Sequence, residues 1–549
     1  MTYAQIARLR ETLAAHPGSA AALCALGTAL WRAGQREEGL SRLQQAVQAD
    51  PGHLESLTHL GNALSASGRP EEAESFYRAV LAARPDDATI YFNIGCAWLA
   101  AGDAARAEAG FRAALAWRPD YAAALTNLGS ALRQQGRTAE ALEPYRRAVA
   151  LRPDLPGLHG NLGSALLALG RADEALAPLR MAARLDPDNA EACNNLGGVL
   201  LALDQAPEAA GWFRLAVRHD PAHCQARFGL ALALLAQGEF RAGWEEYEAR
   251  WLDPAFTADE RRFDQPAWRG DEAVEGRTIL LHAEQGLGDT LQFVRYAPLL
   301  RDRGARVILQ VQPPLMGLLA DLADAVIARD SVPPSFDLHC PLLSLPRAFA
   351  TGLHSIPAGI PYLRAPPAHL ALWSARLGER RRRRIGIVVS GDPAHPEDAQ
   401  RSIPATLFLA AFEGIDADLH VLEKHIRAAD APALAGLHRH DPLIEDFRDS
   451  AALAMLMDLV VTVDTALAHL AGGLGVPVWV LLQQGADFRW LRGRTDSPWY
   501  PTARLFRQPR YGDWPSVLAA VNAAGRSPSV HLAARSPQRA LPPGRPQGA

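Results

Sequence analysis

Lysine is almost absent from this 549-residue sequence: Lys424 is the only lysine among 56 lysine and arginine residues. The 60 acidic residues slightly outnumber the basic ones, and the net charge is -4. A chain with this balance has no overall positive field that would attract nucleic acid or an acidic membrane surface. We therefore predict no nucleic-acid partner, and any binding surface must be local.

Cysteine is also scarce, and its spacing excludes common metal modules. The five cysteines include no Cys-x-x-Cys pair and stand near no histidine cluster of zinc-finger spacing. The first residues lack the apolar core of a secretory signal peptide. The most apolar stretch, residues 459–482, contains Asp464, His469 and Pro477, and predicts strand, helix and strand rather than a membrane span. We predict a cytoplasmic protein without an integral membrane segment.

What the chain does contain is a repeat of 34 residues. One proline recurs at this interval and is expected to end a helix each time. These prolines are Pro17, Pro51, Pro85, Pro119, Pro153, Pro187 and Pro221. Glycines stand ten residues later, where two helices approach closely, in six repeats. They are Gly27, Gly61, Gly95, Gly129, Gly163 and Gly197. Further glycines, at the turn between the two helices, are Gly34, Gly68, Gly102, Gly136, Gly170 and Gly238.

Each unit reads P-D-x-A-x-x-x-x-N-L-G-x-A-L-x-x-x-G-R-x-x-E-A. This pattern resembles the tetratricopeptide repeat from residue 17 to about residue 252. The resemblance implies an α-solenoid over residues 1–252, whose units bury their apolar faces against their neighbours. Solenoids of this kind present a groove for a protein or peptide partner.

An asparagine ladder follows the same period, at Asn93, Asn127, Asn161 and Asn195. An amide side chain both donates and accepts hydrogen bonds, so the ladder could hold the backbone of an extended peptide. It resembles the ladder of the O-linked N-acetylglucosamine transferase superhelix. The alternative is that each asparagine bonds only to the adjacent repeat.

Beyond residue 252 the period stops. Residues 253–276 read as a connector, and apolar runs then alternate with helical segments, which predicts two α/β halves with mostly parallel sheets at 277–379 and 380–525. The predicted strands are 278–283, 306–311, 325–328, 336–340, 385–389, 419–422, 459–463 and 478–482. A helix is expected at 289–303. Residues 526–549 are rich in proline, serine, arginine and glycine, and are predicted to be disordered.

Five consecutive arginines, 380–384, precede one of these strands. A nucleic-acid patch would be expected to carry interleaved aromatic residues, and none is present here. We interpret the run as a solvated segment before a strand.

Three motifs stand at predicted strand ends, where parallel α/β sheets bind ligands. In the first, a loop of Gln285, Gly286 and Gly288 contains two glycines that let the backbone come close to a ligand. Asp289 then begins a helix, either as its N-cap or as a reactive carboxylate.

The second motif opens at Asp464, which could cap the next helix or accept hydrogen bonds from sugar hydroxyls. The amides of Thr465, Ala466 and Leu467 at this helix start suit a diphosphate. His469, one turn later, is either a packed histidine or a ligand.

In the third motif, Ser390 and Gly391 follow a strand, and Arg401 lies shortly beyond. A hydroxyl, an amide and a guanidinium together could hold a phosphate.

The three segments EQGLGDTLQFVRYAPLL, RSIP and DTALAHLAGGLGVPVW together resemble the heptosyltransferase-like glycosyltransferases of family 9, in the bacterial form that carries tetratricopeptide repeats in front. The segment DFRWLRGRTDSPWYPTARLFRQ also matches such fusions. The resemblance implies a GT-B fold of two Rossmann-like halves after the solenoid. It also implies inverting transfer from a nucleotide-sugar co-substrate, with no metal and no other cofactor.

Carried over by position, the resemblance makes Asp289 the catalytic base that takes the proton of the acceptor hydroxyl. The donor-binding residues that it implies are Ser390, Gly391, Arg401, Glu423, Lys424, Asp464, Thr465, Ala466, Leu467 and His469. Three positions on the donor side depart from the fusions. Val389, Val421 and Glu423 stand where the fusions commonly have tryptophan, serine and glutamine.

A metal-dependent transferase would need an Asp-x-Asp motif at the carboxyl end of a strand. Asp416-Ala-Asp418 precedes its predicted strand, and Asp186-Pro-Asp188 lies in a repeat turn. Neither is expected to bind a metal ion.

The leading hypothesis is a metal-independent inverting glycosyltransferase whose repeat groove recruits a protein or peptide acceptor. One alternative is a repeat scaffold with a nucleotide-binding half that catalyses nothing. The other is a transferase that acts on lipopolysaccharide or another glycan.

Overall fold

The computed structural model describes residues 3–253, 263–357, 359–395 and 398–526. The chain forms two compact units, Met1–Val199 and Leu200–Ala549. The division falls inside the predicted repeat domain 1–252, because the last helix pairs of the array belong to the second unit. Of the predicted connector, residues 254–262 lie outside the described residues, as does all of the predicted tail after Arg526.

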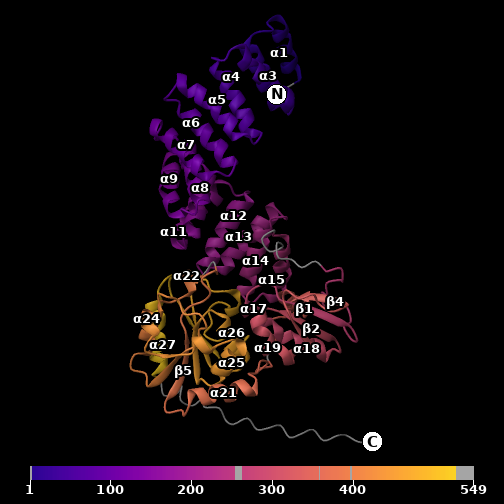
Figure 1. The fold of residues 1–549 in the computed structure, drawn as a ribbon, viewed down its shortest axis with the longest axis vertical. Coiled ribbons are helices and arrows are strands. Elements are labelled where there is room, and N and C mark those ends of the chain that lie inside the picture. Colours follow the sequence, from indigo (N-terminus) through magenta and orange to yellow (C-terminus); the bar gives the residue numbers. More distant parts are fainter. Residues whose placement is uncertain (1–2, 254–262, 358, 396–397, 527–549) are drawn as a thin grey trace. The chain divides into compact units, whose positions relative to one another are not determined.

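Seven helix pairs follow helix α1 (Tyr3–Ala15), in agreement with the 34-residue period (Figure 1). The pairs of the first unit are α2 (Ala20–Arg32) with α3 (Arg36–Ala49), α4 (Leu54–Ala66) with α5 (Pro70–Ala83), α6 (Ala88–Ala100) with α7 (Ala104–Trp117), α8 (Ala122–Gln134) with α9 (Thr138–Leu151), and α10 (Pro156–Ala168) with α11 (Ala172–Leu185). Helix α12 (Ala190–Ala202) spans the boundary between the units. It is followed by α13 (Ala206–His219), α14 (Cys224–Ala236), α15 (Phe240–Tyr247) and a short 3-10 helix, η1 (Glu248–Leu252).

The glycines predicted at the turns adopt the left-handed backbone conformation, for example Gly34 with φ 85° and Gly238 with φ 82°. A residue with a Cβ is strained there, so glycine favours the turn. In the sixth repeat the position is occupied by Asp204, which has a φ of 64°. Its carboxylate pairs with Arg492 of the α/β region at 2.6 Å. The exception to the glycine pattern therefore coincides with an ion pair to the α/β region.

The second set of glycines lies where the two helices of a pair touch. An added Cβ at Gly95 would lie 2.6 Å from the ring of Phe111, and one at Gly163 would lie 2.4 Å from Leu179. Both distances are too short for carbon atoms, which confirms the prediction that these glycines permit close approach.

Helix α10 offers a matched test of this packing. Gly163→Ala is expected to destabilise the repeats by about 1–3 kcal/mol, because the new methyl group overlaps Leu179. Gly160→Ala, three residues away in the same helix, meets nothing within 4 Å and is expected to stabilise them by up to about 1 kcal/mol through helix propensity. Urea unfolding followed by circular dichroism measures both. Equal effects of the two changes would contradict the packing argument.

The second unit contains two parallel sheets. The first has the order β3-β2-β1-β4 and consists of β1 (Thr278–His282), β2 (Arg306–Val311), β3 (Ala325–Ala328) and β4 (Leu338–Pro341). The second has the order β10-β9-β8-β5-β6-β7 and consists of β5 (Arg383–Val388), β6 (Ala417–Val421), β7 (His438–Arg439), β8 (Leu459–Val463), β9 (Val478–Leu482) and β10 (Ala503–Arg507). The predicted α/β class is confirmed for this region.

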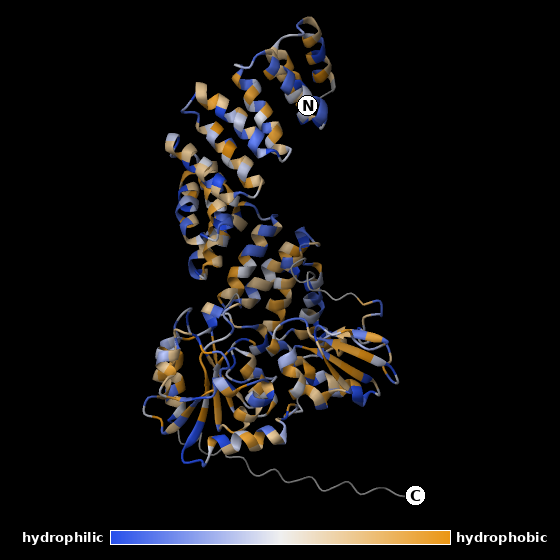
Figure 2. Cartoon of the chain, in the orientation of Figure 1, coloured by the Kyte–Doolittle hydropathy of each residue, from blue (hydrophilic) through white to orange (hydrophobic). Residues whose placement is uncertain are grey.

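Helices separate the strands, and the longer ones are α21 (Pro367–Leu377), α25 (Phe447–Met455), α26 (Ala466–Gly473) and α27 (Trp514–Gly525). The predicted helix 289–303 is instead α17 (Leu287–Phe293), η2 (Val294–Tyr296) and α18 (Ala297–Asp302). Figure 2 shows that the strands are mostly apolar. Along β8, Val460 packs in one core, and Val461 and Val463 pack in another, so both faces of the second sheet are buried.

The last repeat helices share a core with the α/β region. Trp244 of α15 packs edge-on against Phe293 and Phe488, with ring centroids 6.0 and 5.6 Å apart. Tyr247 lies 5.9 Å from Phe488, and all four side chains are buried. Helix α15 therefore serves both as the end of the repeat array and as a structural element of the α/β unit.

Two details of the sequence interpretation need correction. Arg383 and Arg384 are the first residues of β5 and do not belong to a segment before the strand. Arg384 is buried, and its guanidinium donates a hydrogen bond to the carbonyl of Gly378 at 2.8 Å. Asp418 lies within β6 rather than before it, although still near the amino end of that strand.

Three further structural features concern the cysteines, the length of the helices and an Asp-x-Asp sequence. All five cysteines are free thiols. Among the described residues, no helix is long and apolar enough to cross a membrane. The Asp-x-Asp sequence at 186–188 lies in a turn after α11, as predicted.

Candidate active site

The first motif forms the turn between β1 and α17. Helix α17 has Gly286 as its N-cap and begins at Leu287, so Asp289 is its third residue and does not begin it. The carboxylate Oδ2 of Asp289 accepts a hydrogen bond from the Gly286 amide at 2.8 Å. Gln312 donates to the carbonyl of Gln285, also at 2.8 Å, and fixes the other end of the turn. The turn thus holds Asp289 by its own backbone.

The second motif joins β8 to α26, as predicted. Thr465 is the N-cap of α26, and its Oγ1 accepts from the Leu467 amide at 3.3 Å. The Ala468 amide donates to the Thr465 carbonyl at 3.0 Å. The Leu467 amide, which the sequence assigned to a diphosphate, therefore already has a partner in the turn.

The two motifs lie against each other. A Cβ added to Gly288 would stand 2.9 Å from Cδ2 of His469 and 3.6 Å from Cα of Ala466. Glycine at position 288 thus permits helix α17 to approach helix α26. The sequence argument for this glycine was the approach of a ligand, whereas the structure accounts for it by contact between the two motifs.

Arg489 links the first motif to the second sheet. It lies in the short 3-10 helix η8 (Phe488–Trp490), is buried, and forms an ion pair with Asp289. A second nitrogen of its guanidinium, Nη1, pairs with Oδ2 of Asp487 at 2.7 Å. A single guanidinium is therefore shared by two carboxylates next to the contact between the motifs.

The charges of these groups act on one another. Burial raises the pKa of Asp289, and the positive charge of Arg489 opposes that rise. Burial also raises the pKa of Asp464 to about 7, and Asp487 adds to the rise, whereas Arg401 and Arg489 oppose it. Arg401 of the third motif and Arg489 of η8 are therefore both close enough to Asp464 for their charges to act on it.

His395 completes this group from the third motif. Burial lowers its pKa, and the charges of Arg401, Asp398 and Asp289 all act on it. Asp289, Arg401 and Asp464 come from three distant segments and are linked by shared partners: Arg489 acts on both aspartates, and His395 is affected by the charges of Arg401 and Asp289.

The third motif differs in detail from the predicted phosphate grip. The Ser390 amide and hydroxyl both donate to Oε1 of Glu423, at 2.8 and 3.1 Å. The Gly391 amide donates to Oγ of Ser402 at 3.1 Å. Arg401 lies directly over Gly391, and its Nε is buried without a hydrogen-bond partner in the described residues. This nitrogen lies 3.9 Å from Oδ1 of Asp398, beyond hydrogen-bond distance, so Arg401 keeps hydrogen-bonding capacity there.

Glu423 and Lys424 follow β6. Glu423 is 6% exposed, and its Oε2 has no hydrogen-bond partner within the described ranges. Burial raises the pKa of Glu423 to about 7, against the hydrogen bonds that it accepts from Ser390 and Val389. Lys424 is exposed and donates to the carbonyl of Glu445. Glu423 is thus a buried carboxyl group with one unused oxygen.

Stability should depend on pH through Glu423. Its pKa in the folded chain, about 7, exceeds that of an unfolded glutamate, so the folded state holds a proton that the unfolded state has lost. Stability therefore falls as pH rises from about 5 to 8, by about 3 kcal/mol for this group. Glu423→Gln is expected to remove that loss.

The test measures the free energy of unfolding of both chains at pH 5 and pH 8. As pH rises, the free energy of unfolding of the Glu423→Gln chain should increase relative to that of the unmodified chain. Glu413→Gln changes an exposed glutamate and is the control. A difference that stays constant with pH would contradict the prediction.

His469 is a packed residue. It is buried, its Nδ1 lies 2.9 Å from the hydroxyl of Tyr500, and its ring stacks on Trp490 at 5.4 Å. Burial holds the pKa of His469 well below its usual value, so the ring is neutral at pH 7. These contacts favour the packed alternative over the ligand alternative.

The asparagine ladder lies within the first unit, and two of its members bond to the preceding repeat. Asn93 donates to Asn62 at 3.3 Å, and Asn127 donates to Sγ of Cys96 at 3.5 Å. Asn195 donates to Glu191 of its own helix at 3.1 Å, and Asn161 is half-buried. Contact between adjacent repeats therefore accounts for Asn93 and Asn127.

The sequence interpretation did not assign a role to Arg489, Asp487 or Arg250. Arg250 of η1 is fully buried and bonds through two nitrogens to Glu284, at 2.9 and 3.2 Å. Glu284 stands at the start of the first motif. The only local sign was the presence of charged residues within otherwise apolar or aromatic segments, such as Asp487-Phe-Arg489-Trp.

Comparison with known protein families identifies the first part of the chain. Two models described as tetratricopeptide repeat match residues 30–92 and 161–223, and one described as TPR repeat matches residues 129–170. The N-terminal region therefore consists of tetratricopeptide repeats, as the 34-residue period predicted.

A curated relative extends over more of the chain. Protein FlbA of Caulobacter vibrioides is 27% identical over an alignment of 331 residues, and the match covers 55% of this chain and 54% of FlbA. The chain thus spans about half the length of this relative.

Solved structures with similarity include YrrB, described as a TPR protein with an unusual peptide-binding site. It is 24% identical and covers 34% of this chain and 95% of its own, with a TM-score of 0.30. MamA is 22% identical over 30% of this chain and 95% of its own, with a TM-score of 0.28. PilF of Pseudomonas aeruginosa is 19% identical and covers 38% of this chain and 95% of its own, with a TM-score of 0.34.

Proposed function

We propose that this protein is a metal-independent, inverting glycosyltransferase of the GT-B type, which transfers a sugar from a nucleotide-sugar donor to a protein or peptide acceptor. The observation that carries the proposal is the electrostatic linkage of Asp289, Arg401 and Asp464: Arg489 pairs with Asp289, and the charges of Arg489 and Arg401 both act on Asp464. The three linked residues follow β1, β5 and β8, and the two central strands β1 and β5 are where the strand order of each sheet reverses. Parallel sheets bind ligands at such points.

In the proposed reaction, the Asp289 carboxylate takes the proton of the acceptor hydroxyl. The acceptor oxygen then forms a bond to the sugar carbon, while the bond from that carbon to the diphosphate breaks and its electron pair leaves with the nucleotide. Arg489 favours the ionised form of Asp289 against the effect of burial on its pKa, and the ion pair orients the carboxylate. Each carboxylate oxygen retains a lone pair for the acceptor.

The leaving diphosphate gains negative charge, and fixed positive groups stabilise such charge in a water-poor site. Arg401 is suited to this role, since its Nε is buried and has no hydrogen-bond partner among the described residues. The hydroxyl and amide of Ser390 already donate hydrogen bonds to Glu423. We therefore assign binding of the diphosphate to Arg401 and to the start of α26.

Recruitment of the acceptor is assigned to the repeats, since tetratricopeptide repeats are protein-interaction modules. A protein or peptide is preferred over a glycan for that reason.

The test is stabilisation of the full chain by a panel of nucleotide sugars in thermal denaturation. A donor at 100 times its Kd is expected to add about 2.7 kcal/mol to the stability of the folded state. Arg401→Gln should weaken that binding about 10- to 100-fold, because it removes charge-assisted hydrogen bonds. Arg382→Gln, at a 60% exposed side chain, is the matched control.

Transfer itself is then measured with a labelled form of the stabilising donor. Label on protein acceptors supports the proposal, and label on lipopolysaccharide alone would replace the acceptor assignment. If no nucleotide sugar stabilises the chain and no label is transferred, the protein is a repeat scaffold without this activity.

A further inference from the structure

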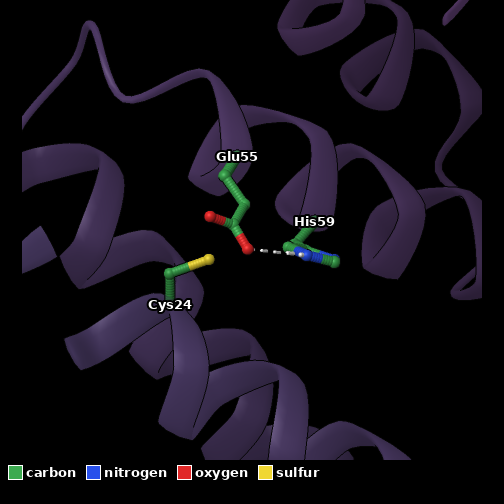
Figure 3. Close-up of side chains that lie close together, drawn as sticks. All are labelled: Cys24, Glu55 and His59. Carbon is green, nitrogen blue, oxygen red and sulfur yellow. Dashed lines mark ion pairs between the residues drawn. The ribbon is translucent and has the colours of Figure 1, made fainter. Parts of the chain in front are cut away.

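Three potential metal ligands converge between the first two repeats. Glu55 and His59 lie four residues apart on α4, so their side chains share one face of the helix. Cys24 comes from α2 of the preceding repeat. One ligand atom from each residue lies within 4.8 Å of the other two, and Figure 3 shows the three side chains directed toward one another.

This arrangement is specific to the second repeat. His59 stands at the position occupied by the asparagine ladder in the third to sixth repeats. Within the described parts of the chain, no other group of three cysteine, histidine, aspartate or glutamate side chains comes this close. Neither Asn93 nor Asn127, at the equivalent position, could supply an imidazole.

We propose that Cys24, Glu55 and His59 bind a zinc ion, with water or a partner's side chain at the fourth position. A thiolate, an imidazole and a carboxylate are ligands that zinc accepts, and three protein ligands with one open position is a common arrangement for it. Ligands about 2.0–2.3 Å from a tetrahedral zinc lie about 3.4 Å apart. Oε1 of Glu55 and Nε2 of His59 are already 3.7 Å apart.

The burial of the three residues suits such a site. Cys24 is 2% exposed, the His59 side chain 28% and the Glu55 side chain 70%. The site is therefore closed on the cysteine side and open on the glutamate side, where the exposed carboxylate is free to move toward the ion.

Binding of a zinc ion would change the protonation of Cys24. The thiol must lose its proton on binding, and the charge of the divalent ion favours that loss.

A zinc ion here would join α2 to α4 and so hold the first two repeats in a fixed arrangement. The inference does not depend on the proposed transferase activity, since all three ligands lie in the first unit.

The experiment uses the full chain stripped of metal with a chelator and then titrated with Co²⁺ as a spectroscopic probe for the zinc site. We expect one Co²⁺ per chain, with a thiolate-to-cobalt charge-transfer band that disappears when Zn²⁺ is added. Cys24→Ser should abolish the band. His59→Asn, which introduces the residue of the other repeats and should fold, is expected to weaken binding at least about tenfold, since even outer partners of metal ligands contribute this much.

Cys193→Ser is the matched control, because Cys193 is also buried on the first helix of a repeat but lies outside the cluster. It should leave the band unchanged. A band that survives in Cys24→Ser, binding without a thiolate band, or failure of the stripped chain to bind one equivalent of Co²⁺ would each overturn the proposal. Circular dichroism of each variant establishes that it is folded.

Discussion

Asp289→Asn is expected to lower the rate of sugar transfer by about 10²- to 10⁴-fold, the usual contribution of a general base. Asparagine has nearly the same shape but cannot take the proton of the acceptor hydroxyl. The fold should survive, because Arg489 keeps its second partner, Asp487, at 2.7 Å. Binding of the donor should remain, since Asp289 is assigned to the acceptor and not to the nucleotide sugar.

The measurement combines initial rates of transfer with thermal stabilisation by the donor. Asp321→Asn, at an exposed aspartate of the same α/β half, is the control and should keep full activity. Undiminished turnover of Asp289→Asn would remove Asp289 as the base. Loss of both turnover and donor binding would show that the residue acts on the structure of the site.

The second large effect concerns Arg250. Replacing it with methionine is expected to destabilise the second unit by about 3–5 kcal/mol, because Glu284 would remain as an unpaired buried charge. Changing both residues to methionine should recover much of that loss, since an apolar pair carries no desolvation cost. Denaturant unfolding followed by tryptophan fluorescence measures these differences.

A matched comparison is the exposed pair Arg152 and Asp154, whose side chains are 52% and 62% exposed. Arg152→Ala should cost less than about 1 kcal/mol, because water screens surface ion pairs. If Arg250→Met costs no more than Arg152→Ala, the buried pair does not support the first motif. If Arg250→Met lowers the free energy of unfolding by the expected amount, the end of the repeat array stabilises the turn that carries Asp289.

Local patterns predicted the elements well. The seven helix pairs follow from proline and glycine at a fixed interval, because each proline stops a helix and each turn glycine adopts a backbone that other residues resist. Strands β2, β3, β8 and β9 agree with the predicted ranges, since each is a short apolar run between turn residues. The short edge strand β7 (His438–Arg439) and the arginine-bearing β10 have no such run, and they were missed.

The candidate site was only partly predictable. Asp289, Arg401 and Asp464 stand at strand ends, and parallel sheets gather such positions at one edge. Arg489 could not be found in the same way, because its partner Asp289 is 200 positions away. The sequence suggested that Ser390 and Gly391 face a phosphate, whereas their amides already donate to Glu423 and Ser402.

The sequence by itself determined the repeat, the order of strands and helices, and the residue types at the strand ends, because these depend on neighbours along the chain. Only the tertiary structure decided that Gly288 packs on His469, that Arg489 pairs with Asp289, and that Arg250 ties the last repeat to the first motif. Such contacts join residues whose separation in sequence carries no periodic signal. They depend on which side chains the fold removes from water together.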